Sequence, residues 1–532
     1  MHIVIADNLP ESAAAPFLER GWTVDAKSGR TPQDLARDLA RADALIVRSA
    51  TQVTADLLAA APRLRVVARA GTGVDNVDLD AASDRGVLVL NAAGANSISV
   101  AELTLGLMIS LARGIAAADA SMKQGAWDKK RFTGIELRGK LLGVIGFGRI
   151  GREVAARARA FGMDVVAHDP FIGSRAAESA AVPLVPLDDL LGRADFVTLH
   201  VPSLPETRHL INAERLSKCR RGIRIVNTAR GELVDEAALA DAIERGIVAG
   251  AAIDVFEQEP PVDRRLANLP QVVATPHIAA STREAQELVG VEVAAAVRDY
   301  LAEGVIRNAV NFPAVPVEEM PAVRPFLDAA EKLGRFVAQL APERPQAIGI
   351  RYYGEIASRH ETILGSAVLA GALSPFVDGA VTQVNARKLA ADRGIEVVES
   401  RSTRPRDFVN VISVKLHGSN GERWAEATVL HPGRPRLCSL EGIDIEMPLA
   451  GTLIVIRNDD TPGVIGNVGS ILGRHGVNIG SFGLGRADGS AIGVLAVDPA
   501  PGLGQAVEEL KTLPSVKDVR LVALSSSAAG RV

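Results

Sequence analysis

Short apolar runs alternate with helical stretches along the first half of the chain. HIVIAD, ALIVRSAT, LRVVARAG and GVLVLNAAG come first, and a helix is expected from Glu11 to Arg20. A second series contains LLGVIGFG, DVVAHDP, DFVTLHVP, RIVNTARG, GAAIDVFEQEP and QVVATPHI. Apolar runs separated by helical segments are typical of βαβ units with a parallel sheet. We therefore predict two doubly wound α/β units, the second with six strands.

Two longer segments predict helices that connect these units. From Val100 to Met122 apolar residues recur every three or four positions around most of the helix surface. This pattern predicts one continuous helix, buried between domains or subunits. The segment from Ser281 to Glu303 is also helical in its periodicity, and we expect Ser281 to cap its first turn. This second helix should return the chain to the first unit.

The pattern changes after the second long helix. Prolines at 313, 316, 321 and 325 are unfavourable inside a helix or a central strand, so we predict a linker and a new unit near residue 313. In the mixed α/β region that follows, ARKLAADRG predicts a helix, and IEVVES and FVNVISVKL predict strands. From Gly451 onward the order β-α-β-β-α-β predicts a ferredoxin-like fold.

Length and composition indicate a globular chain of several domains. The chain has 532 residues, of which 47% are hydrophobic, and its net charge of -4 argues against a nucleic-acid-binding surface. Two distant cysteines, Cys219 and Cys438, exclude a disulfide framework and a zinc cage. Leu364 stands where a second histidine would complete a zinc motif with His360, so no metal is expected. Without a long apolar run, we predict a cytoplasmic protein with neither membrane nor nucleic-acid partners.

A dinucleotide-binding motif lies at the start of the second unit. Gly146, Gly148 and Gly151 form G-x-G-x-x-G between the strand LLGVI and the helical segment REVAARARAFG. Asp169 follows at the end of the next expected strand, where its carboxylate can accept hydrogen bonds from both ribose hydroxyls. Because that carboxylate would repel a 2′-phosphate, the sequence predicts NAD rather than NADP. The alternative is that the glycines only form a tight turn.

Three chemically suited side chains follow successive strands of the second unit. They are Arg230, Glu259 and His277, at the edge where doubly wound sheets bind ligands. An imidazole exchanges protons near neutral pH, and a carboxylate beside it fixes its protonation state. A guanidinium binds a substrate carboxylate and stabilises charge that develops on oxygen. Together they predict a 2-hydroxy acid dehydrogenase, although each residue alone is compatible with a structural ion pair or hydrogen bond.

With these motifs the chain resembles the D-isomer-specific 2-hydroxyacid dehydrogenases over nearly its whole length. VRSAT, ARAGTGVDNVD and NAAGANSISVAE resemble the family's substrate-domain motifs, and the tail resembles an ACT domain, an amino-acid-binding regulatory module. The resemblance is closest to long members that oxidise D-3-phosphoglycerate to 3-phosphohydroxypyruvate in serine synthesis. Those relatives use NAD, and L-serine inhibits them through the ACT domain.

The resemblance implies an α/β fold with two doubly wound Rossmann-like domains, an α/β intervening regulatory domain and a ferredoxin-like ACT domain. For the intervening domain, regulation by a bound anion and a spacer role in assembly are equally open. The expected boundaries are 1–97 and 283–312 for the two parts of a substrate-binding domain, 98–282 for the NAD-binding domain, 313–450 for the intervening domain and 451–525 for the ACT domain.

Position by position, the resemblance also implies three sets of binding residues. Asn458 departs from the aromatic or histidine side chain common in the family, and Ala279 and Ala280 stand where glycine often occurs. The implied sets are Arg48, Ser49, Gly73 and Asn96 for the substrate; Arg149, Ile150, Asp169, His200, Pro202, Thr207, Thr228, Asp254, His277, Ala279 and Ala280, beside the three glycines, for NAD; and Asn458, Asp460 and Asn478 for L-serine.

The cationic segment WDKKRF adds Lys129 and Arg131 to the expected substrate residues, because a phosphorylated substrate needs more positive charge than lactate. The alternative is a solvated charge run. In relatives this segment reaches a neighbouring subunit's active site. The resemblance therefore implies a homo-oligomer, expected to be a tetramer.

Two other functions stay open. The same reacting centre would serve a dehydrogenase of glyoxylate, formate or another 2-oxo acid. A corepressor-like protein that senses NADH would keep the nucleotide site without turnover. The complete reacting centre and the ACT-like tail favour the enzyme.

Overall fold

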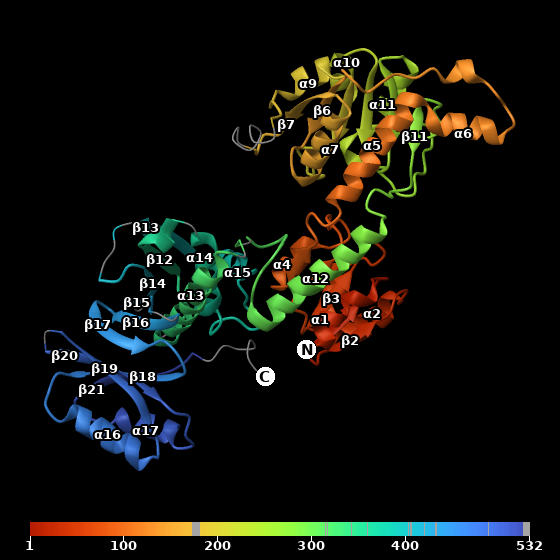
Figure 1. Cartoon of the computed structure of the whole chain (residues 1–532). Coiled ribbons are helices and arrows are strands. Elements are labelled where there is room, and N and C mark those ends of the chain that lie inside the picture. The colour runs from red at the N-terminus through yellow and green to blue at the C-terminus, as the bar shows by residue number, and fades with distance from the viewer. Residues whose placement is uncertain are drawn as a thin grey trace.

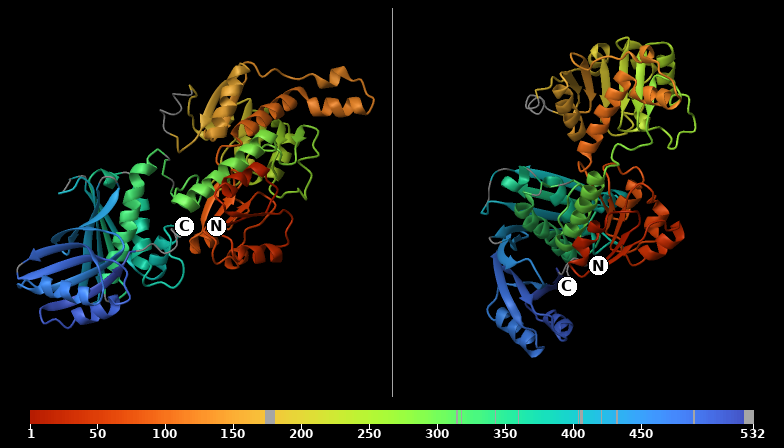
Figure 2. Two further views of the ribbon diagram at one scale, coloured as in Figure 1. Left: turned by 60° about the horizontal axis from the view of Figure 1, so that its bottom comes forward. Right: turned by 45° about the vertical axis from the view of Figure 1, so that its right-hand side comes forward.

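The computed structural model contains four β-sheets in its described part, and they follow one another along the chain (Figure 1). It describes residues 1–524 apart from 173–180 and the positions 314, 317, 342, 359, 403, 405–406, 420, 431–432 and 488. Residue 525, the expected end of the ACT domain, lies outside the described residues. The second and fourth sheets lie at opposite ends of the molecule in all three views (Figures 1 and 2).

The first sheet is parallel, with the strand order β2-β1-β3-β4-β5. Its inner strands are buried on both faces, which explains their continuous apolar runs. The structure adds β2, a half-exposed edge strand whose sequence TVDA has no apolar run, and it shortens the helix expected from Glu11 to Arg20. The elements are β1 (His2–Ile5), η1 (Glu11–Ala13), α1 (Ala15–Leu18), β2 (Thr23–Ala26), α2 (Pro32–Leu39), β3 (Ala44–Val47), α3 (Ala55–Ala59), β4 (Val66–Arg69), α4 (Leu79–Asp84) and β5 (Leu88–Asn91).

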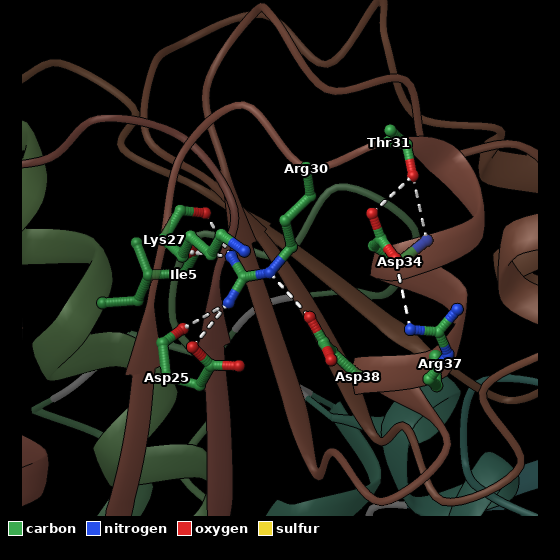
Figure 3. Close-up of polar contacts among 8 residues, drawn as sticks. All are labelled: Ile5, Asp25, Lys27, Arg30, Thr31, Asp34, Arg37 and Asp38. Carbon is green, nitrogen blue, oxygen red and sulfur yellow. Dashed lines mark hydrogen bonds and ion pairs between the residues drawn. The ribbon is translucent and has the colours of Figure 1, made fainter.

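A buried arginine fastens one end of this sheet (Figure 3). The Arg30 side chain is 1% exposed and forms ion pairs with Asp25 at 2.6 Å and Asp38 at 2.8 Å. It also donates to the backbone carbonyl of Ile5 at 3.1 Å. Thr31 caps α2 by accepting from a backbone N–H in its first turn. The network therefore joins β1, β2 and α2, and it satisfies a buried charge that would otherwise be costly.

The second sheet is also parallel, with the order β11-β10-β9-β8-β6-β7, which confirms the expected six strands. Two apolar clusters lie on its opposite faces, as in a doubly wound fold. Its elements are α5 (Ser97–Arg113), α6 (Ile115–Lys123), η2 (Lys129–Phe132), β6 (Leu141–Ile145), α7 (Arg149–Ala160), β7 (Asp164–His168), α9 (Leu187–Arg193), β8 (Phe196–Leu199), α10 (Ala213–Lys218), β9 (Ile223–Asn227), η3 (Gly231–Leu233), α11 (Glu236–Glu244), β10 (Val248–Ile253) and β11 (Val272–Ala274).

The prediction of one buried helix from Val100 to Met122 was wrong. Gly114 has φ 63° and ends α5 in the left-handed conformation, and α6 continues at 66° to it. Glycine adopts that conformation without the steric cost that other residues meet. No residue of α6 is buried, and α6 projects away from the second sheet (Figures 1 and 2). Among the described residues no single helix is long and apolar enough to cross a bilayer; only this bent pair, taken together, meets both criteria.

The second long helix is α12 (Arg283–Glu303), which packs on the first sheet as predicted. Its cap was assigned wrongly. Thr282 rather than Ser281 is the extended residue before the helix, and its hydroxyl accepts from the backbone N–H of Ala285 at 3.1 Å. Ser281 instead closes a turn by donating its backbone N–H to Ile278. Helices α5 and α12 form the two connections between the first and second sheets (Figure 1).

The third sheet is mixed, with the order β13-β12-β14-β15-β16-β17. The linker interpretation of the prolines was partly wrong, because Pro321 and Pro325 lie inside α13. Pro321 occupies the first turn, where a backbone N–H has no helical partner, so a proline there removes no hydrogen bond. The elements are α13 (Met320–Leu340), β12 (Ala347–Tyr353), η4 (Glu355–Ser358), α14 (Glu361–Leu373), α15 (Ala386–Asp392), β13 (Glu396–Ser402), β14 (Val411–Gly418), β15 (Gly421–Leu430), β16 (Arg434–Leu440) and β17 (Ile443–Pro448).

The fourth sheet is antiparallel with the order β19-β20-β18-β21, which confirms the ferredoxin-like prediction. It shares one apolar core with the third sheet, because Leu453 and Val494 pack in the same cluster as Leu333 and Ile445. Without side chains, Gly483 and Gly485 of β19 let β17 approach closely. The elements are β18 (Thr452–Asp459), α16 (Val464–Arg474), β19 (Ile479–Ala487), β20 (Ser490–Val497), α17 (Leu503–Leu510) and β21 (Val516–Ala523).

Candidate functional site

The carboxyl ends of the six parallel strands of the second sheet lie in register. Paired in the sheet, His168, Ile145, Leu199, Asn227, Ile253 and Ala274 form one row across it. The residues that directly follow these strand ends therefore form a second row, in the order Asp169, Gly146, His200, Thr228, Asp254 and Thr275. Five of these six positions were predicted to bind cofactor, and the fold brings them to one edge.

The glycine-rich turn suits a dinucleotide pyrophosphate. Gly146 has φ 90°, and a Cβ there would lie 2.5 Å from the carbonyl oxygen of His200. A Cβ on Gly151 would lie 2.1 Å from the Gly146 carbonyl oxygen, so only glycine allows the helix to start so close to the strand. Gly148 faces open space before α7, whose first N–H groups have no side-chain cap. An uncapped helix N-terminus behind an open glycine favours an anion.

Asp169 contacts this turn from the end of β7, and Arg149 lies within it at the start of α7. One Asp169 oxygen accepts from the backbone N–H of Phe147 and the other from that of Phe171, both at 2.9 Å. Each carboxylate oxygen can accept more than one hydrogen bond, so the group can still bind a ribose hydroxyl. The Arg149 guanidinium donates to the backbone carbonyl of Ala93 in the first domain. These contacts fit the expected NAD site.

The middle of the edge is polar and buried. His200 accepts or donates through Nε2 with the Thr198 hydroxyl at 3.0 Å, and burial lowers the pKa of His200 to about 3. The hydroxyls of Thr228 and Thr104 are 2.8 Å apart, which ties α5 to the strand end. The loop beyond His200 is closed by Thr207, whose hydroxyl donates to the carbonyl of Pro202 at 2.7 Å. Ile150 is half-buried in the first turn of α7.

His277 and Glu259 are in direct contact. Nδ1 of His277 lies 2.7 Å from Oε2 of Glu259, whose other oxygen accepts from the backbone N–H of Phe256 at 3.1 Å. The imidazole and carboxylate are 48% and 39% exposed, so both face the edge rather than the core. With Nδ1 directed at the carboxylate, Nε2 is the nitrogen left to exchange a substrate proton.

Asp254 holds the loop that carries His277. Its carboxylate is fully buried and accepts from the Thr275 hydroxyl at 2.6 Å and from the backbone N–H groups of Ile278 and Ala279, each at 2.9 Å. The backbone N–H of His277 donates to the Asp254 carbonyl at 2.8 Å. These hydrogen bonds hold the His277 backbone at φ 52°, in the left-handed region, which costs energy for a residue other than glycine. Ala280 follows Ala279 in this loop.

Arg230 is positioned by residues that the motif analysis did not identify. Asn227 donates to the Arg230 carbonyl at 2.8 Å and shapes the turn after β9. A Cβ on Gly231 would lie 1.9 Å from the Phe256 carbonyl carbon, so this turn is pressed against the segment that leads to Glu259. Arg230 Nε donates to Asp75 of the first domain at 3.2 Å. The position of Asn227 at the end of an expected strand was the signal in the sequence that could have identified it as a site residue.

The expected substrate residues of the first domain lie on loops at the ends of its strands. A Cβ on Gly73 would lie 1.8 Å from Nη2 of Arg230, so this glycine meets the guanidinium directly. Asn96 is buried and accepts from the Thr72 hydroxyl at 2.8 Å. Arg48 donates its backbone N–H to Asp7 at 2.5 Å, and Ser49 is exposed beside it. The structure thus brings Gly73 to Arg230 across the two domains.

Lys129 and Arg131 lie elsewhere. They belong to η2, an exposed turn in the segment that follows α6, and Trp127 just before it is 83% exposed. The Arg131 guanidinium lies over the Phe132 ring at 5.7 Å. Figure 1 shows that the α6 segment points away from the first domain, so within one chain the fold does not bring these two cations to Arg230.

The expected effector residues are also separated. Asn458 is buried and donates to the Asp459 carbonyl at 2.8 Å, Asp460 pairs with Arg486 at 2.6 Å, and Asn478 donates to Asp498 at 2.8 Å. Asn458 pairs with Ala491 at one end of β20, whereas Ile479 and Thr452 pair with Val497 at the other. Six strand residues at ~3.3 Å each put these ends about 20 Å apart. One chain does not bring Asn478 to Asn458 and Asp460.

Three family models match successive parts of the chain. The NAD binding domain of D-isomer specific 2-hydroxyacid dehydrogenases matches residues 105–279, the D-3-phosphoglycerate dehydrogenase intervening domain matches 322–441, and the ACT domain matches 452–515. The first match contains the glycine-rich turn, Arg230, Glu259 and His277.

Relatives that match nearly the whole chain are dehydrogenases. A D-3-phosphoglycerate dehydrogenase of Methanocaldococcus jannaschii is 41% identical, with 98% of this chain and 99% of the relative covered. One of Bacillus subtilis is 40% identical with the same coverage. A crystal structure of a glyoxylate reductase from Paecilomyes thermophila is 30% identical with a TM-score of 0.55, and covers 58% of this chain and 98% of that one. The likeness to the shorter enzyme is therefore confined to part of the chain.

Proposed function

The chain belongs to the D-isomer-specific 2-hydroxyacid dehydrogenase family, in its long form with intervening and ACT domains, and we propose that it oxidises D-3-phosphoglycerate to 3-phosphohydroxypyruvate. This is the first step of L-serine synthesis. The observation that carries the proposal is the contact of His277 with Glu259 at the edge where Arg230 meets Gly73 of the other domain. NAD bound along this edge would supply the acceptor for the hydride that leaves C2 of the substrate.

His277 takes the proton of the substrate's 2-hydroxyl through Nε2. The Nδ1 hydrogen bond to Glu259 at 2.7 Å fixes the ring orientation and stabilises the imidazolium that forms. Glu259 is itself held by the backbone N–H of Phe256, so the carboxylate stays in place as the charge on the ring changes. The fixed geometry reduces the reorganisation that the proton transfer requires.

Arg230 supplies the cation for the substrate's carboxylate and for the oxygen that becomes the carbonyl. Its Nη2 lies over Gly73, where a substrate carboxylate would lie between the two domains. We assign Arg48, Ser49 and Asn96, on loops that follow strands of the first domain, to the substrate as well. The substrate phosphate needs further cations, and we assign them to Lys129 and Arg131 of a neighbouring subunit because the α6 segment that leads to them projects away from the first domain of the same chain (Figure 1).

The effector residues support the same assembly. Asn458 and Asp460 lie at one end of the fourth sheet and Asn478 lies at the other. A second copy in the opposite direction would bring the two halves together, so we propose that L-serine binds between ACT domains of a homo-oligomer, expected to be a tetramer. Cys219 and Cys438 are not joined in a disulfide, in keeping with a cytoplasmic enzyme.

The proposal is tested by a coupled NADH assay with D-3-phosphoglycerate, with and without L-serine, and by the His277→Ala variant. Loss of a general base costs roughly 10²- to 10⁴-fold in rate, so kcat should fall by about that factor while NADH binding stays intact. Glyoxylate serves as the comparison substrate. Higher kcat/KM with glyoxylate would contradict the substrate assignment, and unchanged turnover in His277→Ala would contradict the role of the histidine.

A further inference from the structure

The loop from Gly71 to Asn76 lies next to Arg230 and is held by several side-chain hydrogen bonds. Asn76 donates to the carbonyls of Arg48 at 2.7 Å and Thr51 at 2.6 Å. Asn91 donates to the Thr72 carbonyl at 2.5 Å, and the Thr72 hydroxyl donates to Asn96. The amide of Asn76 within the loop, together with Asn91 and Asn96 outside it, therefore ties this loop to its neighbours. Its one carboxylate, Asp75, is presented from a rigid support.

Asp75 contacts the guanidinium of Arg230 across the boundary between the two domains. Nε of Arg230 donates to Oδ2 of Asp75 at 3.2 Å, while Nη1 donates to the Ala229 carbonyl at 2.6 Å. With Nε and Nη1 engaged, Nη2 is directed over Gly73, where a Cβ would lie 2.7 Å from Oδ2 of Asp75. Two of the three guanidinium nitrogens thus fix the direction of the third.

Asp75 also lies among several cations. The Arg69 side chain folds over Gly71, where a Cβ would lie 2.2 Å from its Nη1, and its Nε is buried without a partner among the described atoms. Burial lowers the pKa of Arg69, and the charge of Arg230 lowers it further whereas Asp75 opposes that shift. A carboxylate in this position weakens the attraction for an anionic substrate. Its presence is therefore unfavourable for substrate affinity and needs a different explanation.

We propose that Asp75 is a positioning residue for the reaction: by holding Nε of Arg230 from the opposite domain, it aims Nη2 at the substrate. The inference rests on the proposed function, in which Arg230 binds the substrate. Substrate affinity is exchanged for a fixed orientation of the guanidinium, because a reacting geometry displaced by 1 Å can cost about 10²-fold in rate.

The test is Asp75→Asn in the full chain, with kcat and KM for D-3-phosphoglycerate measured separately. We expect kcat to fall about tenfold because the amide holds the guanidinium weakly, and KM to fall because a negative charge is removed. Asp75→Glu should recover part of kcat. Asp80→Asn, an exposed carboxylate in the first turn of α4, is the matched control and should leave both constants unchanged.

Two outcomes would overturn the inference. A lower KM with unchanged kcat would mean that Asp75 acts only through its charge. A loss of thermal stability with both constants unchanged would mean a purely structural contact.

Arg230→Gln separates this result from the proposed function: if that variant keeps wild-type kcat/KM, the role of Arg230 itself is wrong. If Arg230→Gln is inactive and Asp75→Asn keeps kcat, only the Asp75 inference fails. On the Arg230→Gln background, Asp75→Asn should have no further effect on kcat.

Discussion

The reacting centre and the expected effector residues differ in how the fold brings their members together. Arg230, Glu259 and His277 follow three neighbouring parallel strands, so the register of one sheet suffices to bring them to one edge. Asn458 and Asn478 lie at opposite ends of an antiparallel sheet, about 20 Å apart. Parallel strands collect chemistry at one end within a single chain, whereas antiparallel strands distribute it to both ends. The three residues of the first region therefore meet within one chain, whereas those of the second region do not.

The largest effect expected in the first region, apart from loss of His277, comes from Asp254→Asn. The amide would present N–H groups toward backbone N–H groups of the 275–279 loop, so the loop should lose its anchoring. We expect kcat to fall roughly ten- to a hundredfold and the free energy of unfolding to fall by about 1–3 kcal/mol. Steady-state kinetics and urea unfolding measure both. Asp241→Asn, on the exposed side of α11, is the control; equal effects of the two substitutions would contradict the anchoring role.

A pH experiment addresses His200, because burial at this edge of the sheet disfavours its protonated form. Burial lowers the pKa of His200 from 6.5 to about 3. Below pH 6.5 the unfolded chain binds a proton that the folded chain does not, so the free energy of unfolding falls as the pH falls from 6.5 toward 3. At pH 5 the loss is about 2 kcal/mol, from ~1.36 kcal/mol per pKa unit. His200→Gln should flatten this dependence, measured by urea unfolding across the same pH range.

The second region is tested by mixing subunits. Asn458→Ala and Asn478→Ala should each raise the L-serine concentration for half-maximal inhibition about fivefold, since one hydrogen bond contributes ~1 kcal/mol, and leave kcat unchanged. An assembly that contains one chain of each variant would keep one intact pocket if the site lies between copies. Co-expression should then restore part of the inhibition. If the mixture is as insensitive as either variant alone, the pocket lies within one chain and the contrast between the two regions is wrong.

The smallest effect is on stability, at the residue where the His277 loop ends and α12 begins. Thr282→Ala should destabilise α12 by about 1 kcal/mol, because the threonine hydroxyl caps the helix and also contacts the Ser99 hydroxyl at 2.7 Å. Ser281→Ala, one residue earlier, should cost almost nothing. Denaturant unfolding of both variants measures the difference. The reverse order of effects would restore Ser281 as the cap.

The sequence predicted the two parallel sheets and the ferredoxin-like tail because their apolar runs and turn glycines are local signals. Sequence-based prediction failed where more than one structure was compatible with the local residues. Ser281 and Thr282 can both cap a helix, and only the backbone conformation selects Thr282. Gly114 lies inside an otherwise helical pattern, and its helix-breaking role depends on whether the chain turns there. Edge strand β2 has no apolar run because none of its residues is buried.

By itself, the sequence determined the chemistry: a glycine-rich turn with Asp169, and a histidine, a glutamate and an arginine placed after successive strands. Those are properties of residue type and spacing, which follow the chain. The tertiary structure alone decided that Asp75 meets Arg230 from another domain, that Asp254 anchors the loop of His277, and that Asn478 lies far from Asn458. Such contacts join residues distant in sequence, so they depend on strand order and domain packing, and no local pattern encodes them.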